Sequence, residues 1–229
     1  MSQQSFNLYH IPFDQILKTV EKNLENSVYD FSRHIIQLID QDHQSLGFIR
    51  LPLHVAIGND PLQVLDQQPT ILYLSIESGN AALCVMEGKE MCYHTTFSAY
   101  MSRKKQGFSQ IKYLNKKGKS RAGSRVRLAA TVEFFENINT SLTALFKQYD
   151  FDRIAINCNA TLIPYLHQSK VACPFTKKDE RLYKIPLHIP KSNFSNLEAT
   201  IKKLMAPWLF YDTTHEKQIT ATLAEVVGE

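Results

Sequence analysis

Several features of common protein classes are missing from this sequence. Its few cysteines are too scattered for a disulfide framework, and they form neither a C-x-x-C pair nor a Cys/His zinc spacing (Cys84, Cys92, Cys158 and Cys173). The eight histidines never fall at His-x-x-x-His spacing. We therefore expect reduced, mostly buried thiols, no metal site and no cofactor.

Long apolar runs are also missing. No run approaches the roughly 18 to 20 residues of a membrane-spanning helix, and the first residues have neither the basic flank nor the apolar stretch of a signal peptide. With 229 residues, 44% of them apolar and 21% charged, the composition is typical of a globular protein with one large domain or two small ones. We therefore expect a cytoplasmic protein with no membrane partner.

Acidic residues are absent from one long stretch of the chain. Between Glu90 and Glu133 there is no Asp or Glu, whereas ten basic residues lie there. The rest of the chain carries 16 Lys and Arg against 22 Asp and Glu, so this segment supplies the whole positive excess of a protein with net charge +4. Such an asymmetry indicates a polyanionic partner.

The first part of the chain predicts one helix followed by short strands. From Phe13 to Leu38 apolar residues recur at spacings of three and four, and Pro12 suits a first helical position. We therefore expect an amphipathic helix over about 12–40. Short strands are expected at 48–51 and 53–57.

The central part predicts an antiparallel meander, with strands at 71–76, 82–86 and 91–97 separated by turn residues. The elements expected after the basic segment are a helix at 128–149, a strand at 153–157, a helical turn at 162–167, a strand at 181–187 and a helix at 197–204. This order predicts a mixed-sheet α/β fold with flanking helices. We expect a main domain at 66–206, residues 1–65 packed on it, and a C-terminal extension at 207–229.

The basic segment is expected to form an exposed loop that binds RNA. Arg121, Arg125 and Arg127 oppose the positive end of the following helix, so stability does not require them. A polyanion would satisfy these arginines and the free amides at the helix start, and Phe108 and Tyr113 offer ring faces for unstacked bases. The candidate RNA-binding residues are Arg103, Lys104, Lys105, Gln106, Phe108, Lys112, Tyr113, Lys116, Lys117, Lys119, Arg121, Arg125 and Arg127.

Two short motifs in this loop resemble a known family. They are Gln-Gly-Phe-Ser-Gln at residues 106–110 and Ser-Arg-Ala-Gly-Ser-Arg at residues 120–125. With the order of meander, basic loop, long helix and strand, they resemble the middle, peptidyl-tRNA-hydrolysing domain of archaeal and eukaryotic class-1 peptide chain release factors. The resemblance is closer to the release-factor-like domain of the Vms-type family, which is involved in ribosome-associated quality control. It extends over about residues 66–206 and implies an RNase H-like topology.

The resemblance implies a translation-rescue activity. Gln110, with Gly107 and Ser109, would enter the peptidyl-transferase centre of the large ribosomal subunit and meet the CCA end of a peptidyl-tRNA. Release would occur by ester hydrolysis or by cutting the tRNA near that end. A neutral amide at a glycine-flanked turn supplies a dipole for a developing oxyanion without titrating, and Gly107 permits close approach to RNA. We expect a monomeric peptidyl-tRNA hydrolase or tRNA-cleaving enzyme.

The residues leave other functions open. Release factors have a second glycine where this chain has Phe108, and this difference favours a non-catalytic module that docks on the ribosome or tRNA through loop 103–127. A ribonuclease-H-like metal nuclease would need paired carboxylates such as Asp150 and Asp152, but we interpret these as turn and capping residues. The loop serines have no nearby base in the sequence, which disfavours a covalent serine mechanism.

Overall fold

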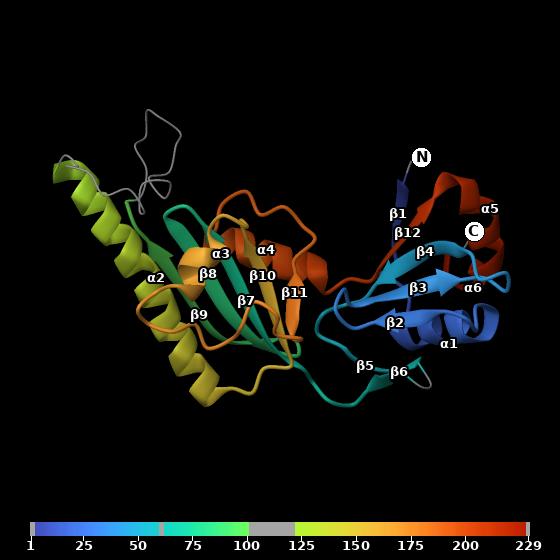
Figure 1. Cartoon of the computed structure of the whole chain (residues 1–229). Helices are drawn as coiled ribbons and strands as arrows, with labels where there is room; N and C mark the ends of the chain where they lie inside the picture. The colour runs from blue at the N-terminus through green and yellow to red at the C-terminus, as the bar shows by residue number, and fades with distance from the viewer. Residues whose placement is uncertain (1–2, 60–61, 101–121, 228–229) are drawn as a thin grey trace. The chain divides into compact units, whose positions relative to one another are not determined.

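The computed structural model describes residues 3–59, 62–100 and 122–227, without the side chains of residues 59, 122–127 and 227. The chain forms two compact units (Figure 1). The first comprises Met1–Pro69 and Thr200–Glu229, and the second comprises Thr70–Ala199.

A five-stranded antiparallel sheet is the centre of the first unit, with the strand order β1, β12, β4, β3, β2. The bounds are β1 Gln3–Asn7, β2 Val28–Asp30, β3 Ile35–Ile39, β4 Ser45–Arg50 and β12 Trp208–Asp212. A separate hairpin pairs β5 (Ala56–Asn59) with β6 (Leu62–Leu65). The helices are α1 Phe13–Asn23, α5 Glu216–Thr222 and α6 Ala224–Val227, and a 3₁₀ turn covers Thr213–His215.

One face of this sheet carries the core of the first unit. Ile36, Ile49 and Leu209 lie side by side on β3, β4 and β12 and are fully buried. Helix residues such as Val20 of α1 and Ile219 of α5 complete the same cluster. Removal of this apolar surface from water drives the helices onto the sheet.

The predicted helix over 12–40 is wrong beyond Asn23. Leu24 has φ −139° and ψ 60°, which ends α1, and the chain continues into the antiparallel pair of β2 and β3. His34 lies in the turn between these strands with φ 51°, a value outside the helical region. The neighbouring β-branched residues Ile35 and Ile36 favour a strand, although their spacing from the preceding apolar residues also fits a helix.

The expected C-terminal extension, residues 207–229, forms part of the first unit. β12 pairs with both β1 and β4, so that Leu209 lies opposite Phe6 and Ile49. The Leu8 amide donates to the Pro207 carbonyl at 3.0 Å. These pairings join the two ends of the sequence, and the pattern within a segment does not reveal so distant a partner.

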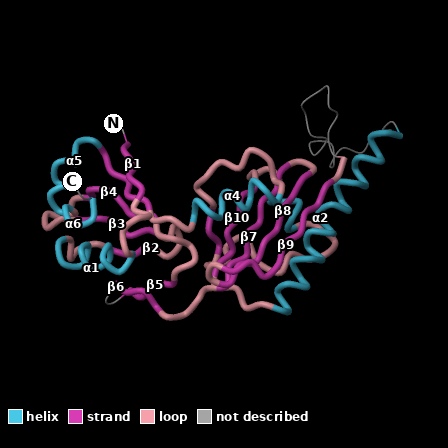
Figure 2. The backbone as a smooth tube through the Cα atoms, turned by 180° about the vertical axis from the view of Figure 1, so that it is seen from behind, coloured by secondary structure: helices cyan, strands magenta, loops and turns pink. Residues whose placement is uncertain are grey.

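The second unit confirms the predicted α/β class with a mixed sheet in the order β11, β10, β7, β8, β9. β10 runs parallel to β7 and β11, and the other pairs are antiparallel. The bounds are β7 Thr70–Glu77, β8 Asn80–Glu87, β9 Glu90–Ser98, β10 Arg153–Cys158 and β11 Leu182–Lys184. β7, β8 and β9 are the predicted meander (Figure 2).

Helices cover both faces of this second sheet. They are α2 Ala122–Gln148, α3 Ile163–His167 and α4 Phe194–Leu204. On one face, α2 residues such as Phe135 and Ile138 pack against Leu72 and Leu83 of the sheet. On the other face, the His94 ring stacks on Phe194 at the start of α4. The sheet is therefore the middle of three layers, and the central six residues of β7 are all buried.

Candidate nucleic-acid interface

Most of the predicted site residues lie outside the described residues. These are Arg103, Lys104, Lys105, Gln106, Gly107, Phe108, Ser109, Gln110, Lys112, Tyr113, Lys116, Lys117, Lys119 and Arg121. The backbone of Arg125 and Arg127 lies in the first turns of α2. The catalytic and RNA-binding roles of these residues stay predictions. The structure describes the elements that precede and follow their segment, which are β9 and α2.

We call the two ends of the chain that bound this segment the stems. They are the end of β9 and the start of α2. β9 runs to Ser98, and the next residue, Ala99, donates its amide to the Gly79 carbonyl at 2.9 Å. This bond ties the outgoing chain to the turn between β7 and β8. α2 begins at Ala122, so residues 101–121 connect the edge strand of the second sheet to its longest helix.

Packing holds α2 firmly on the sheet. Phe134, Phe135, Ile138, Leu142 and Leu145 are each at most 4% exposed and belong to the core of the second unit. Buried side chains of this size fix the position of the helix because any shift would open voids or cause clashes. From Thr131 onward, α2 is therefore fixed on the sheet by its buried side chains.

The electrostatics at the start of α2 favour an anion. The first turn of the helix contains no acidic residue, and the first carboxylate along it belongs to Glu133. The positive end of the helix dipole thus has no acid from its own helix to offset it. Arg125 and Arg127, both within the first two turns of the helix, add to the positive charge of this stem.

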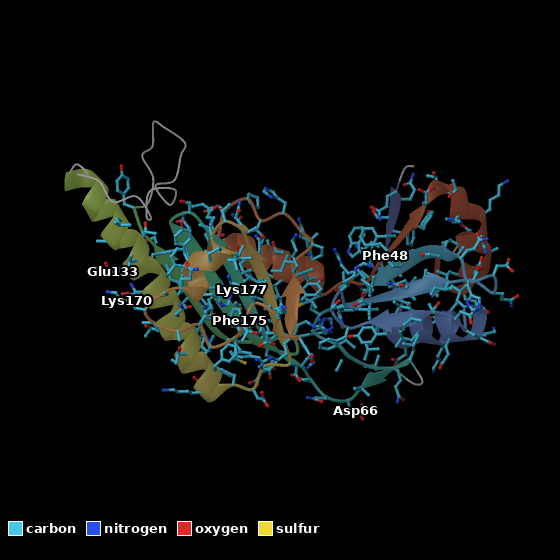
Figure 3. All side chains as sticks on the ribbon, in the orientation of Figure 1. Phe48, Asp66, Glu133, Lys170, Phe175 and Lys177 are labelled. Carbon is cyan, nitrogen blue, oxygen red and sulfur yellow. The ribbon has the colours of Figure 1, made fainter. Side chains whose placement is uncertain are left out.

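A cavity of about 360 Å³ lies between the two stems. Its polar groups come from Thr96 and Ser98 on β9 and from Glu133 and Asn137 on α2, where Figure 3 labels Glu133. The rings of Phe97 and Phe134 and the methyl groups of Ala99 and Ala130 complete the wall. The only charged group among the described lining residues is the Glu133 carboxylate.

Sequence reasoning missed this cavity. β9 and α2 are separated by the basic segment, and nothing in either stretch indicates that Thr96 and Asn137 share a wall. Among the residues that line the cavity, only Glu133 stands out in the sequence, because it ends the stretch without acidic residues.

Three of the four cysteines are poor candidates for a nucleophile. None of the four takes part in a disulfide; Cys84 is buried as expected, whereas Cys158 and Cys173 are half-buried and Cys92 is exposed. Burial raises the pKa of the Cys84 and Cys158 thiols to about 12 and that of Cys173 to about 11. Since the thiolate is the reactive form, this shift disfavours a nucleophilic role for these three side chains at neutral pH.

Of the two aspartates considered for a metal nuclease, Asp152 has a structural role. Its Oδ2 accepts the Thr70 amide at 2.8 Å. Among the residues that the structure describes, no group of three or more His, Cys, Asp and Glu side chains is arranged to hold a metal ion. No described helix is long and apolar enough to cross a membrane.

The comparison with protein families is decisive for the second unit. Residues 71–209, more than half of the chain, match the model of the Bacteroidetes VLRF1 release factor family. The chain belongs to this family. The resemblance inferred from the loop motifs is thereby confirmed, and this VLRF1 protein is a release-factor homologue related to translation. The match begins in β7 and ends in β12, so it covers the second unit and omits the first 70 residues.

No curated protein matches this VLRF1 sequence. A solved structure described as the Vms1 mitochondrial localization core is similar with 12% identity and a TM-score of 0.45, over 85% of this chain and 82% of that one.

Proposed function

We propose that this VLRF1 protein acts in the cytoplasm as a monomer that docks on the large ribosomal subunit and releases the peptide from a stalled peptidyl-tRNA. The observation that carries the proposal is the coincidence of the family match with ten basic residues and no acidic one between Glu90 and Glu133. The pairing of β9 with β8 and the packing of α2 from Thr131 onward support it, because a loop that enters a narrow RNA site needs a fixed base.

The basic residues supply affinity, and the Gln-Gly-Phe-Ser-Gln motif supplies the chemistry. Lys and Arg neutralise phosphates without reading sequence. Gln110 then positions a water molecule or stabilises the oxyanion that forms when the water attacks the ester carbonyl. The bond to the ribose oxygen breaks, and that oxygen takes up a proton as the free tRNA end leaves. Cleavage of the tRNA near its CCA end is the second way in which the same loop position would release the peptide.

A second candidate function is docking without catalysis. Phe108 stands where release factors have glycine, and a side chain there restricts the backbone and adds bulk beside the scissile bond. The same ring is suited to stack on a terminal base.

Peptide release from isolated, obstructed large subunits separates the two functions. Gln110→Ala should leave subunit affinity nearly unchanged and lower release by about 10- to 1000-fold, the range for one lost transition-state contact. The matched control is Gln148→Ala, at an exposed glutamine near the end of α2. Phe108→Gly should preserve or raise release if the ring only restricts the turn.

Two results would overturn the catalytic assignment. Full release by Gln110→Ala would remove Gln110 from the chemistry. Tight binding with no release by the wild type, Gln110→Ala and Phe108→Gly alike would establish the docking function instead. Where release occurs, the products also show which bond is cut, because ester hydrolysis leaves the tRNA intact.

A further inference from the structure

β9 is an edge strand of the sheet in the second unit. None of the described strands pairs with its outer side, and at nine residues it is the longest of the described strands. Edge strands usually carry lysines, prolines or bulges that prevent further pairing. The register shift of β9 lies opposite Val85 and Met86, and residues 93–98 beyond it contain no lysine, proline or carboxylate. This part of the edge is therefore open to pairing with another strand.

The backbone of this edge directs hydrogen-bonding groups away from the sheet. In an antiparallel ladder, every second residue directs its amide and carbonyl to the neighbouring strand. Ala99 donates its amide to the Gly79 carbonyl at 2.9 Å, so Phe97 and Thr95 direct their backbone groups toward β8 as well. The residues between them direct theirs outward, and these are His94, Thr96 and Ser98.

A groove lies between this edge and α2. One wall of the cavity of about 360 Å³ consists of the four consecutive residues 96–99. Because successive side chains point to opposite faces of a sheet, a wall of consecutive residues lies along the edge of the strand. The other wall is one side of the helix, with residues at spacings of three and four, namely Ala130, Glu133, Phe134 and Asn137. A strand added to β9 would therefore lie between β9 and α2.

The same edge exposes apolar side chains next to the groove. Met91 is 42% exposed and Tyr93 is 37% exposed. The Tyr93 side chain points to the α2 side of the sheet, because it lies opposite the core residue Val85. In complexes formed by strand addition, side chains of this kind select among peptides, while the main chain supplies hydrogen bonds.

The charges around the groove favour a cationic partner. The one charged group in the described walls is the exposed Glu133 carboxylate. Residues 128–146 of α2 contain two glutamates and no Lys or Arg, and residues 90–99 contain Glu90 and no Lys or Arg. The arginines of α2 end at Arg127, before the first helix residue of the groove. An RNA strand would bring phosphates beside Glu133, whereas a lysine or arginine side chain would neutralise it.

We propose that the groove binds an extended peptide of another protein, which adds a strand to β9 and places a lysine or arginine beside Glu133. Hydrogen bonds to the outward backbone groups of residues 94, 96 and 98 supply affinity, and Glu133 and the Tyr93 ring supply selectivity. The proposal does not rest on docking through the basic loop. It gives the second unit a protein partner in addition to an RNA partner.

Selection from a display library of random peptides of about nine residues tests the class of partner directly. With the full chain as bait, the enriched peptides should carry β-branched or aromatic residues at alternate positions and at least one lysine or arginine. Enrichment of acidic peptides, or of none, would overturn the proposal.

Amide hydrogen exchange on the full chain shows where an enriched peptide binds. The amides of Thr95 and Phe97 face β8 and should exchange slowly with or without the peptide. Saturating peptide should slow exchange at His94, Thr96 and Ser98 by about tenfold or more, because these amides gain hydrogen bonds. Slowed exchange at another surface instead would overturn the addition of a strand to β9.

Glu133→Lys tests the charge of the groove. This variant should weaken binding of the enriched peptide by about tenfold or more, since attraction of its cationic side chain becomes repulsion. The matched control is Glu180→Lys, the same change at an exposed residue of the second unit, and it should change the affinity by less than about twofold. Equal effects of the two variants would overturn the proposal.

Thr96→Pro tests the backbone of the edge. Proline removes an amide that points away from β8, and an edge strand tolerates proline at such a position. Peptide binding should be lost, whereas Thr96→Ala should retain it at a similar melting temperature. Unchanged binding by Thr96→Pro would overturn the proposal, and so would a dimer of the chain that this variant abolishes, because the edge would then pair with a second copy.

A loop variant separates this proposal from the proposed function. Changing Lys116, Lys117, Arg121 and Arg125 to Glu removes positive charge from the basic loop and should abolish docking on the large subunit. The same variant should bind the enriched peptide at least as tightly as the wild type, since the added carboxylates attract a cationic peptide. Loss of peptide binding in this variant would place the peptide on the loop and overturn the groove as its site.

Discussion

The two units contain sheets of equal strand number that are buried in different ways. In the second unit, α2 and α4 cover both faces, and the residues from Ile71 to Ile76 are all buried. In the first unit, α1, α5 and α6 pack on one face, and on the other face Phe48, Trp208 and Phe210 are half-buried whereas Ile35 and Arg50 are buried. A strand that is buried on both faces cannot slip or bend without disrupting two cores, whereas a strand of a half-covered sheet is held by one main core.

This difference suggests a division of roles. The doubly covered sheet serves as the rigid base for the segment that connects β9 to α2. The sheet of the first unit joins the two ends of the sequence instead. Substitutions that act on one sheet and not on the other can test this comparison.

The largest expected effect is in the core of the second unit. Phe135→Ala should lower the free energy of unfolding of that unit by about 3–5 kcal/mol, because the ring is 2% exposed and its loss leaves a cavity between α2 and the sheet. Phe48→Ala, on the face of the first unit's sheet opposite to α1, α5 and α6, should cost about 1–2 kcal/mol, since its ring is half-buried. Hydrogen exchange in denaturant measures each unit separately. Equal costs would remove the distinction between the two sheets.

A smaller effect is expected at a buried amide of α2. Asn139 is fully buried, and its Nδ2 donates to the carbonyls of Leu166 and Val171 at 2.8 Å each. Asn139→Ala should cost about 2 kcal/mol because both carbonyls lose this donor. The control Thr140→Ala, at the adjacent exposed residue, should change stability by less than about 0.5 kcal/mol. Similar values for the two variants would show that the amide does not hold the chain at 166–171 against α2.

The smallest effect is expected at an ion pair near β11. The Arg181 side chain donates to Asp179 at 2.8 and 2.9 Å, and this hydrogen bonding lowers the pKa of the Asp179 carboxyl. The charged form is favoured in the folded state, so the pair stabilises the protein above the unfolded pKa of about 3.9 and loses this contribution as the pH falls through the lower folded pKa.

Asp179→Asn should therefore cost about 1 kcal/mol at neutral pH, a modest value because the Arg181 side chain is 34% exposed to solvent. The difference from the wild type should vanish at acidic pH in urea unfolding experiments. A cost that does not depend on pH would contradict the ion pair as its source.

Local patterns in the sequence predict much of the second unit. The strands of the meander are short apolar runs bounded by turns such as Gly79 and Gly88, both of which have positive φ. α2 is long and has buried residues at regular spacing. Each of these patterns lies within a single segment, so the strand or helix can be predicted without knowing which distant residues it packs against.

The first unit was harder to predict because its partners are distant in sequence. The apolar spacing from Val28 to Leu38 fits a helix as well as two strands, and only the turn at His34 decides. β12 has the length of a strand, but its place between β1 and β4 depends on residues at the other end of the chain. The loop motifs identified the family, whereas the cavity between the stems required the folded geometry.

The central claim is that the acid-free segment between Glu90 and Glu133 docks on ribosomal RNA. The most direct test is the affinity of the protein for large subunits as a function of salt, measured by cosedimentation. With about six phosphate contacts, the affinity should fall by about a thousandfold between about 50 and 200 mM salt.

Changing Lys116, Lys117, Arg121 and Arg125 to Glu should abolish docking. The matched control makes the same charge change at four exposed lysines of the second unit, Lys147, Lys177, Lys178 and Lys184, and should retain most of the affinity and the salt dependence. An affinity that is flat with salt, or equal loss of docking in the two variants, would contradict the claim.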